Sequence, residues 1–240
     1  PTSQNVLDLS FKLNYVQADE KGTSNVVDNG VKKVVKVVKG DGTQKSDEIC
    51  IENECFYVMY SDGETVTMLS KYNLHVGNKT DSTNGVVALE SPTGIQDETA
   101  RGWFRTFTID NPIIGVKSFS LTNYWKDTTS TYPAYVYASN SILYNYVENY
   151  KTYLGTLGVT PIETRLITKE ELESLGCTKT VSGCNGAPEW VYLTSYWSGT
   201  AYTSTRVFVI DSTGVFSSDN YNMNNGYGVR PVVTISRSLL

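Results

Sequence analysis

Two segments bound the last part of the chain, Tyr196-Trp197-Ser198-Gly199 and Gly228-Val229-Arg230-Pro231-Val232-Val233-Thr234-Ile235-Ser236. The second segment contains a run of β-branched residues, which is typical of a buried strand. Trp197 in the first segment is expected to anchor the core, because burying so large an apolar side chain stabilises the fold. The two segments therefore predict a scaffold on either side of the residues between them.

The stretch from Ser198 to Arg230 contains no Lys, Glu, Gln, Leu or Trp. It is rich in Ser, Thr, Asn, Asp, Gly and Tyr, with a few larger residues such as Arg206 and Phe208. Tyr offers rigid contact area at low entropic cost, and Ser, Gly and Asn offer adaptable hydrogen bonds, as in antibody paratopes. The composition therefore favours a ligand-binding surface; ordinary short hairpins with polar turns are the alternative.

The strand expected around residue 208 is predicted to bury one face. Val207 and Ile210 are assigned to the core, which leaves Phe208 for the exposed face together with Arg206 and Asp211. Aromatic anchors surrounded by adaptable polar groups are the expected mode of binding. The predicted ligand-binding residues are Tyr202, Ser204, Arg206, Phe208, Asp211, Asp219, Asn220, Asn222, Asn225 and Tyr227. The residues assigned to the core rather than to ligand stacking are Trp103, Trp125, Trp190 and Trp197.

The composition excludes several classes of protein. With 240 residues, 40% hydrophobic and 19% charged, the chain is expected to be globular, with ample material for a core. The net charge is −5 and no face of clustered Lys and Arg is found, so nucleic acid is not an expected partner. No apolar stretch approaches the ~18 residues that span a bilayer. Contact with a membrane is therefore expected only through an anchor upstream of Pro1.

The four cysteines form two local pairs, Cys50 with Cys55 and Cys177 with Cys184. A two-residue turn at Glu52-Asn53 would place the first pair at opposed positions of a hairpin, where a cross-strand disulfide fits. The second pair would close a short loop after a helix. A zinc site is the alternative, but neither pair has C-x-x-C spacing and the single histidine, His75, is distant from both in sequence. Two disulfides are favoured, and they indicate an oxidising, extracellular setting.

The segments before residue 103 predict strands. Strands are expected at residues 31–38, 49–51, 55–60 and 65–69, with an Asp-Gly turn at Asp62-Gly63 before the last. Residues 77–102 are rich in Gly, Asn, Ser and Thr and are expected to form loops. A soft boundary at residues 40–47 divides the chain into an N-terminal segment or linker, 1–45, and a main domain, 46–240.

Two helices are expected in mid-chain. Ser139-Asn140-Ser141 is the predicted cap of the first, which Gly155 or Gly158 ends. The second begins at the capping box that Thr168 and Glu171 form, and ends at Gly176. The apolar face expected for the first helix consists of Ile142, Leu143, Tyr146, Val147, Tyr150 and Leu154. Two helices followed by strands indicate an α+β fold.

This order of elements resembles bacterial and phage domains of unknown function with C-type lectin-like, formylglycine-generating-enzyme-like folds. The resemblance covers roughly residues 45–238 and is carried by Arg165 to Leu172, by Tyr196-Trp197-Ser198 and, most specifically, by Gly228 to Val233. Some proteins of this fold are the variable proteins of diversity-generating retroelements, in which mutagenesis at adenines diversifies a segment near the C-terminus. Substitution at the adenines of Asn codons does not produce Lys, Glu, Gln or Trp, which fits the composition described above.

The resemblance implies a C-type lectin-like fold of antiparallel strands with two helices, preceded by a short N-terminal segment. It implies an extracellular receptor or adhesin without enzymatic activity, which binds a protein or glycan on another cell or surface through residues 198–228. The Glu-Pro-Asn, Gln-Pro-Asp and Trp-Asn-Asp triplets of calcium-dependent lectins are absent, so no metal and no cofactor are expected. A tip subunit on a pilin-like or membrane-anchored stalk is the alternative. A formylglycine-generating enzyme is disfavoured, because its reactive cysteine pair lies near the C-terminus and none here follows Cys184.

Overall fold

The computed structural model describes residues 34–74, 95–96, 131–135, 142–179, 183–220 and 227–240, and the strand backbone at 16–18, 24–26, 77–81, 85–88 and 115–116. The chain divides into two compact units, Pro1–Lys33 and Val34–Leu240. In the first unit, β1 (Val16–Ala18) and β2 (Ser24–Val26) pair antiparallel.

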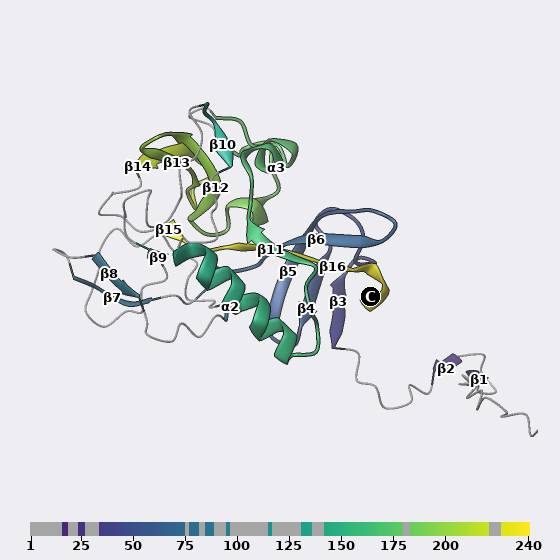
Figure 1. Ribbon diagram of the computed structural model, residues 1–240. Coiled ribbons are helices and arrows are strands. Elements are labelled where there is room, and N and C mark those ends of the chain that lie inside the picture. The colour runs from purple at the N-terminus through teal and green to yellow at the C-terminus, as the bar shows by residue number, and fades with distance from the viewer. Residues whose placement is uncertain are drawn as a thin grey trace, which may run out of the picture. The chain divides into compact units, whose positions relative to one another are not determined.

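The first large sheet of the second unit has six strands, and all of its pairs are antiparallel. Figure 1 shows the C-terminal strand, in yellow, between strands from earlier parts of the chain. In spatial order the strands are β11 (Glu163–Leu166), β16 (Pro231–Ser236), β6 (Thr65–Ser70), β5 (Glu54–Ser61), β4 (Glu48–Ile51) and β3 (Val35–Lys39). The strands expected before residue 70 are therefore present, and the last strand returns to pair with them.

Because of strand β3, the boundary between the two units lies earlier in the chain than predicted. Val35 lies opposite Ile51 of β4 and is only 4% exposed. Because this strand both pairs and buries a side chain, it belongs to the second unit. The division therefore falls between Lys33 and Val34, earlier than the boundary at 40–47 that the loop-rich composition indicated.

The second large sheet carries most of the stretch between residues 196–199 and residues 228–236. Its path is β14 (Phe216–Asn220), β13 (Arg206–Ile210), β12 (Tyr196–Thr203), β15 (Tyr227–Gly228) and β9 (Gly115–Val116), and β10 (Ala134–Tyr135) also pairs with β12. The only parallel contact among the described pairs joins the two segments, with Tyr196 opposite Gly228. The rings of Trp197 and Tyr227 lie 4.7 Å apart in an edge-on arrangement.

Two glycines of these segments are explained by close approach of neighbouring groups. A side chain at Gly199 would collide with the ring of Tyr135, and one at Gly228 would collide with the side chain of Asn73. The Asn73 amide donates to the carbonyl of Ser195, at 3.1 Å, so the residue that crowds Gly228 also ties it to the start of β12. Glycine at these positions allows the neighbouring side chains to approach the backbone closely.

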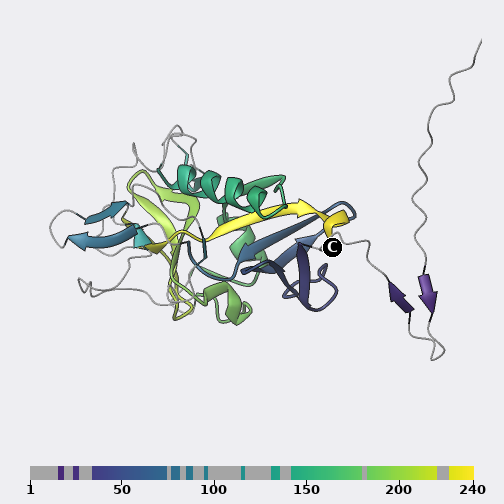
Figure 2. The same cartoon turned by 90° about the horizontal axis from the view of Figure 1, so that it is seen from below.

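Two α-helices lie among the described residues, as the sequence predicts. In α2 (Ile142–Thr156), Tyr146, Val147, Tyr150 and Leu154 are buried, and Gly158 follows with a φ of +93°. Figure 2 shows α2 along one side of the yellow β16 strand. The residues expected to cap it, Ser139 to Ser141, lie outside the described residues. No helix of the described chain is both long and apolar enough to cross a membrane.

The second helix, α3 (Lys169–Ser174), begins at the predicted capping box. The Glu171 amide donates to the Thr168 hydroxyl, and the Glu171 carboxylate accepts from the Thr168 amide. The same carboxylate forms two short bonds, of 2.6 and 2.7 Å, with the guanidinium of Arg165. This pairing holds the pKa of Glu171 below its usual value despite partial burial, and it ties the helix to β11.

The region predicted as loop at 77–102 contains a hairpin, which corrects that expectation. Strands β7 (Gly77–Asp81) and β8 (Gly85–Ala88) pair antiparallel. Their composition lacks an alternating apolar pattern, and backbone pairing does not require one. Two short 3₁₀ helices, η2 (Glu189–Tyr192) and η3 (Arg237–Leu239), complete the described elements, so the fold is α+β with mostly antiparallel strands.

Two hydrophobic clusters form the core, one on each side of the β12–β13 hairpin. The first contains α2 and one face of the first sheet together with Trp197, Val207 and Val209. The second contains Phe208 and Ile210 with side chains from α3, η2 and the disulfide loop. Both faces of β13 are therefore buried, which decides where a ligand surface can lie.

Arg230 is fully buried in the closing segment, where backbone carbonyl oxygens are its partners. Its guanidinium donates to the carbonyl oxygens of Ser70 at 2.7 Å, Trp190 at 2.8 Å and Val191 at 2.9 Å. It also lies 5.0 Å from the ring centroid of Tyr196. Burial lowers the pKa of Arg230, and the carbonyl dipoles take the place of a carboxylate.

Candidate functional site

Three predicted ligand-binding residues lie at the tip of the β12–β13 hairpin. Tyr202 is half-buried at the end of β12, Ser204 is exposed in the turn, and Arg206 is exposed at the start of β13. Within the described part of the chain, the side-chain hydroxyls of Ser204 and Thr205 have no hydrogen-bond partner. Free hydroxyls on a tightly held turn are suited to contact a ligand.

The strand end beside this tip adds two more predicted residues. Asn220 of β14 lies opposite Arg206 in the register of the sheet. Asp219 lies opposite Val207, and its carboxylate accepts a hydrogen bond of 2.9 Å from the Tyr227 hydroxyl. Asn222 and Asn225 follow this strand in sequence and lie outside the described residues.

Phe208 and Tyr227 are corrections to the predicted exposed face. Phe208 is 1% exposed and Tyr227 4% exposed, so neither side chain is displayed. Val207 and Ile210 are buried as predicted. The prediction assumed one buried face, whereas β13 lies between two clusters, so alternate residues enter different cores.

Asp211 lies at the other end of β13, away from the tip. Its carboxylate accepts from the amide of Thr213 at 2.8 Å and from the hydroxyl of the same residue at 2.7 Å. Its amide donates to the Val215 carbonyl, which closes the turn between β13 and β14. This arrangement assigns Asp211 to turn formation.

Lys179 is a residue at the tip that the sequence reasoning missed. It is exposed in the loop that the Cys177–Cys184 disulfide closes, and its ammonium nitrogen lies 2.9 Å from the centroid of the Tyr202 ring. We define the hairpin-tip surface as Lys179, Tyr202, Thr203, Ser204, Thr205 and Arg206. Only the disulfide loop between two cysteines signalled that residue 179 would be held in place, and nothing in the sequence joined it to residue 202.

Both predicted disulfides are formed, and the zinc alternative is wrong. Cys50 pairs with Cys55 across β4 and β5, and Cys177 pairs with Cys184. The Glu48 carboxylate lies near the first pair, but the sulfurs there are bonded to each other, so they are not thiolate ligands. Glu48 itself pairs with the Lys71 ammonium at 2.6 Å.

A buried acid forms a polar network far from the tip. Glu54 is 3% exposed. Its carboxylate accepts hydrogen bonds from the Tyr150 hydroxyl at 2.8 Å and from the backbone amide of Gln96 at 3.0 Å. Burial raises the pKa of Glu54, and burial beside this carboxylate raises that of Tyr150. The Gln96 side chain donates to the Cys55 carbonyl and to Tyr150, so the network ties three segments together. These hydrogen bonds join side chains of different segments to one another, which is typical of a structural network.

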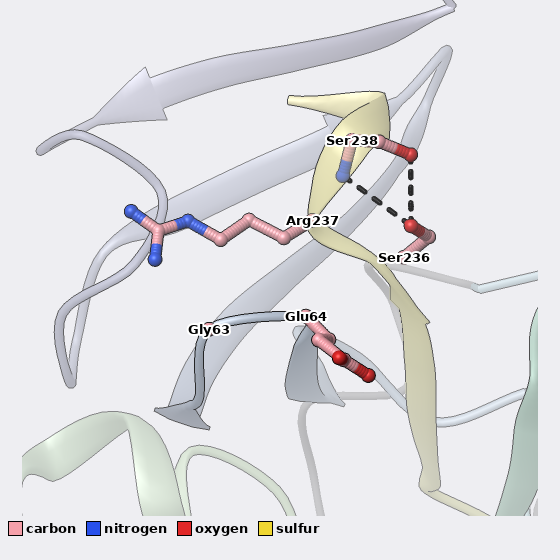
Figure 3. A pocket seen from close by; sticks show the side chains of 5 residues that line it. All are labelled: Gly63, Glu64, Ser236, Arg237 and Ser238. Carbon is pink, nitrogen blue, oxygen red and sulfur yellow. Dashed lines mark hydrogen bonds between the residues drawn. The ribbon is translucent and has the colours of Figure 1, made fainter.

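A surface hollow of about 540 Å³ lies between the β5–β6 turn and η3. Figure 3 shows the Arg237 and Glu64 side chains extending in different directions from its rim. The hydroxyls of Ser236 and Ser238 are bonded to each other at 2.8 Å. The hollow gathers no set of convergent polar groups, so the hairpin-tip surface remains the better candidate for binding. His75 lies outside the described residues, as do Trp103 and Trp125.

No family model, curated protein or solved structure matches the chain.

Proposed function

We propose that this protein is an extracellular, non-enzymatic binding protein that presents the hairpin-tip surface to a partner. One observation carries the proposal. The turn that joins β12 and β13 is polar and exposed, while the strands that support it are buried on both faces. A variable, adaptable loop on a rigid scaffold is how proteins present changeable binding surfaces.

The placement of the predicted residues supports this function. Tyr202, Ser204 and Arg206 lie at one tip, and the register of the sheet brings the end of β14 beside them. The ligand surface that we propose is thus narrower than residues 198–228: it comprises the tip and the β14 end, without Phe208, Asp211 and Tyr227.

The topology supports a C-type lectin-like fold. The closing strand β16 pairs with β6 from the first part of the chain, and the β12–β13–β14 hairpins lie between the helices and that closing strand in sequence. In this fold family the segment before the closing strand is the one that varies in proteins of diversity-generating retroelements. We propose the same for the residues at the tip.

The two disulfides support an extracellular location. Disulfides persist in oxidising compartments and are rare where thiols are kept reduced. The Cys50–Cys55 bond joins two strands of the first sheet. Cys177 and Cys184 are fully buried in the second cluster.

A steric block at the tip tests the proposed function. The substitution Thr203→Asn creates the sequence Asn-Ser-Thr, an acceptor for an N-linked glycan, at the exposed turn. Expressed in a glycosylating host, this variant is expected to lose every ligand that the wild-type protein binds on arrays of glycans and cell-surface proteins. Its thermal unfolding is expected to match that of the wild type, because the glycan projects from the turn.

A matched control places the same modification elsewhere. Gly63→Asn creates Asn-Glu-Thr in the β5–β6 turn, where a side chain at residue 63 would meet open space. This variant is expected to bind as the wild type does; the native Asn78-Lys79-Thr80 acceptor is common to all three proteins. Array binding that survives at the glycosylated tip, or an array on which the wild type binds nothing, would contradict the proposal.

Comparison of sibling genes tests the diversification. Substitutions are expected to concentrate in residues 202–206 and 219–225 and to spare the buried residues 207–210 and 229–235. An even spread of substitutions over the surface would disprove the retroelement interpretation. The binding function would then be tested by the array experiment alone.

A further inference from the structure

The half-buried ring of Tyr202 at the hairpin tip lies beside a cation. The Lys179 ammonium lies 2.9 Å from the Tyr202 ring centroid and 5.4 Å from that of Phe208. The Tyr202 ring lies edge-on to Phe208, with 5.3 Å between centroids, and Phe208 packs in turn on Phe216. The lysine is therefore held on an aromatic platform whose base is part of the core.

The loop that carries Lys179 is held in place independently of that platform. The Cys177–Cys184 disulfide closes it, and both cysteines are buried in the cluster that contains Phe208. The Thr178 amide donates to the Gly183 carbonyl at 2.8 Å. A short crosslinked loop loses little entropy when its side chain engages a partner, so the lysine is preorganised for binding.

Arg206 supplies the second cation on the same face of the sheet. Its guanidinium donates to the Ser218 carbonyl at 2.9 Å, which leaves its other donors available. Arg206 and Phe208 are two residues apart on β13, so their side chains lie on the same face of the strand, and the Tyr202 ring contacts Phe208 there. The pKa of the Tyr202 hydroxyl is lowered by the adjoining Lys179 and also by Arg206, which agrees with this placement. In the described part of the chain, neither cation has a carboxylate partner.

We propose that Lys179, Tyr202 and Arg206 form a cationic subsite that binds carboxylate side chains of an acidic segment on a protein partner. This inference rests on the proposed function and names the chemistry that the same surface selects. Ammonium and guanidinium groups form charge-assisted hydrogen bonds with carboxylates, and the free hydroxyls of Ser204 and Thr205 add donors beside them. The chain carries a net charge of −5, so two cations without carboxylate partners among the described residues also direct an acidic partner to this surface.

A protein partner is favoured over a saccharide because of the state of the aromatic ring. Sugars are usually held by stacking on an open aromatic face. Here Lys179 covers a face of the Tyr202 ring and Phe208 meets the ring as well. The subsite therefore offers charge and hydroxyl donors in place of a stacking surface, which suits the flexible carboxylates of Asp and Glu side chains.

The test measures binding of a fluorescent oligoglutamate peptide to the purified protein by anisotropy. The wild type is expected to bind it, and raising the salt to about 1 M, where charges are screened beyond about 3 Å, is expected to abolish binding. Lys179→Gln with Arg206→Gln is expected to weaken binding by about tenfold or more. Tyr202→Phe keeps the ring and is expected to retain most of the affinity, whereas Tyr202→Ala is expected to lose as much as the double variant.

Lys36→Gln with Lys39→Gln is the matched control, because it removes the same charge from two exposed lysines of β3. It is expected to bind oligoglutamate as the wild type does. Equal weakening by both double variants would show a general charge effect and overturn the subsite, as would unchanged binding by the tip variant. Tighter binding of a heparin oligosaccharide than of oligoglutamate would overturn the protein partner. These outcomes leave the glycan-block experiment intact, so the two proposals fail separately.

Discussion

Glu54 is a buried carboxylate that this core holds by hydrogen bonds from Tyr150 and Gln96. Burial raises its pKa above the ordinary value of 4.5, while hydrogen bonds from Tyr150 and Gln96 oppose that rise. The folded protein therefore binds a proton more tightly than the unfolded chain does. It follows that the contribution of Glu54 to stability declines as the pH rises from about 4.5 through the raised pKa, and is constant above it.

The substitution Glu54→Gln is expected to remove that decline. An amide oxygen can accept from the same two donors without carrying a buried charge. The free energy of unfolding of the variant, relative to the wild type, is expected to increase as the pH rises from 4.5 to neutrality. Urea unfolding across that range measures it, and a difference that does not change with pH would disprove the assignment.

Glu54→Leu is the informative comparison. It leaves the Tyr150 hydroxyl and the Gln96 amide without their acceptor, so it is expected to destabilise the protein by about 1–3 kcal/mol for each unpaired group. Glu54→Leu is therefore expected to destabilise the protein at every pH.

At the scale of elements, the β12–β13 hairpin separates scaffold from surface within a few residues. Phe208 fills the second cluster, between the rings of Tyr202 and Phe216. Phe208→Ala is expected to cost about 3–5 kcal/mol, because it opens a cavity, and to lower the melting temperature by about 10 °C. Trp197→Ala, in the first cluster, is expected to cost as much.

Tyr202→Ala provides the contrast in the same hairpin. It removes a half-buried ring that packs on Phe208 and Lys179, so a loss of about 1 kcal/mol is expected. Calorimetry of the three variants ranks them. If Tyr202→Ala proved as damaging as Phe208→Ala, the tip would be part of the core and could not serve as a displayed surface.

At the scale of the whole molecule, the boundary between the two units makes a prediction about truncation. The described core residues all lie in Val34–Leu240, so a chain that begins at Val34 is expected to unfold cooperatively at the temperature of the full chain. A chain that begins at Ser46, near the boundary that composition indicated, lacks β3. It is expected to lose several kcal/mol, because Val35 no longer covers the core and β4 becomes an edge strand.

Thermal unfolding and the tendency to aggregate measure the difference between these two chains. Equal stability of both would show that β3 contributes nothing and that the division lies after it. A large loss in the chain that begins at Val34 would show instead that Pro1–Lys33 contributes to the stability of the second unit.

Features that depend only on neighbours along the chain follow from local sequence patterns. The hairpin that pairs Cys50 with Cys55, the capping box at Thr168, the apolar face of α2 and the burial of Trp197 all follow from local patterns. Composition alone also selected Ser204 as a candidate ligand-binding residue, and the structure exposes it in a turn.

Which side chains share a surface depends on packing between segments that are distant in sequence. Sequence periodicity assumes that a strand has one wet face, and it failed at Phe208 because cores lie on both sides of β13. It could not bring Lys179 to Tyr202, because a disulfide loop and a strand end meet only after both have packed on the second cluster. The sequence shows directly which residues are hydrophobic. Which residues stay exposed depends on what the two sheets and their helices cover.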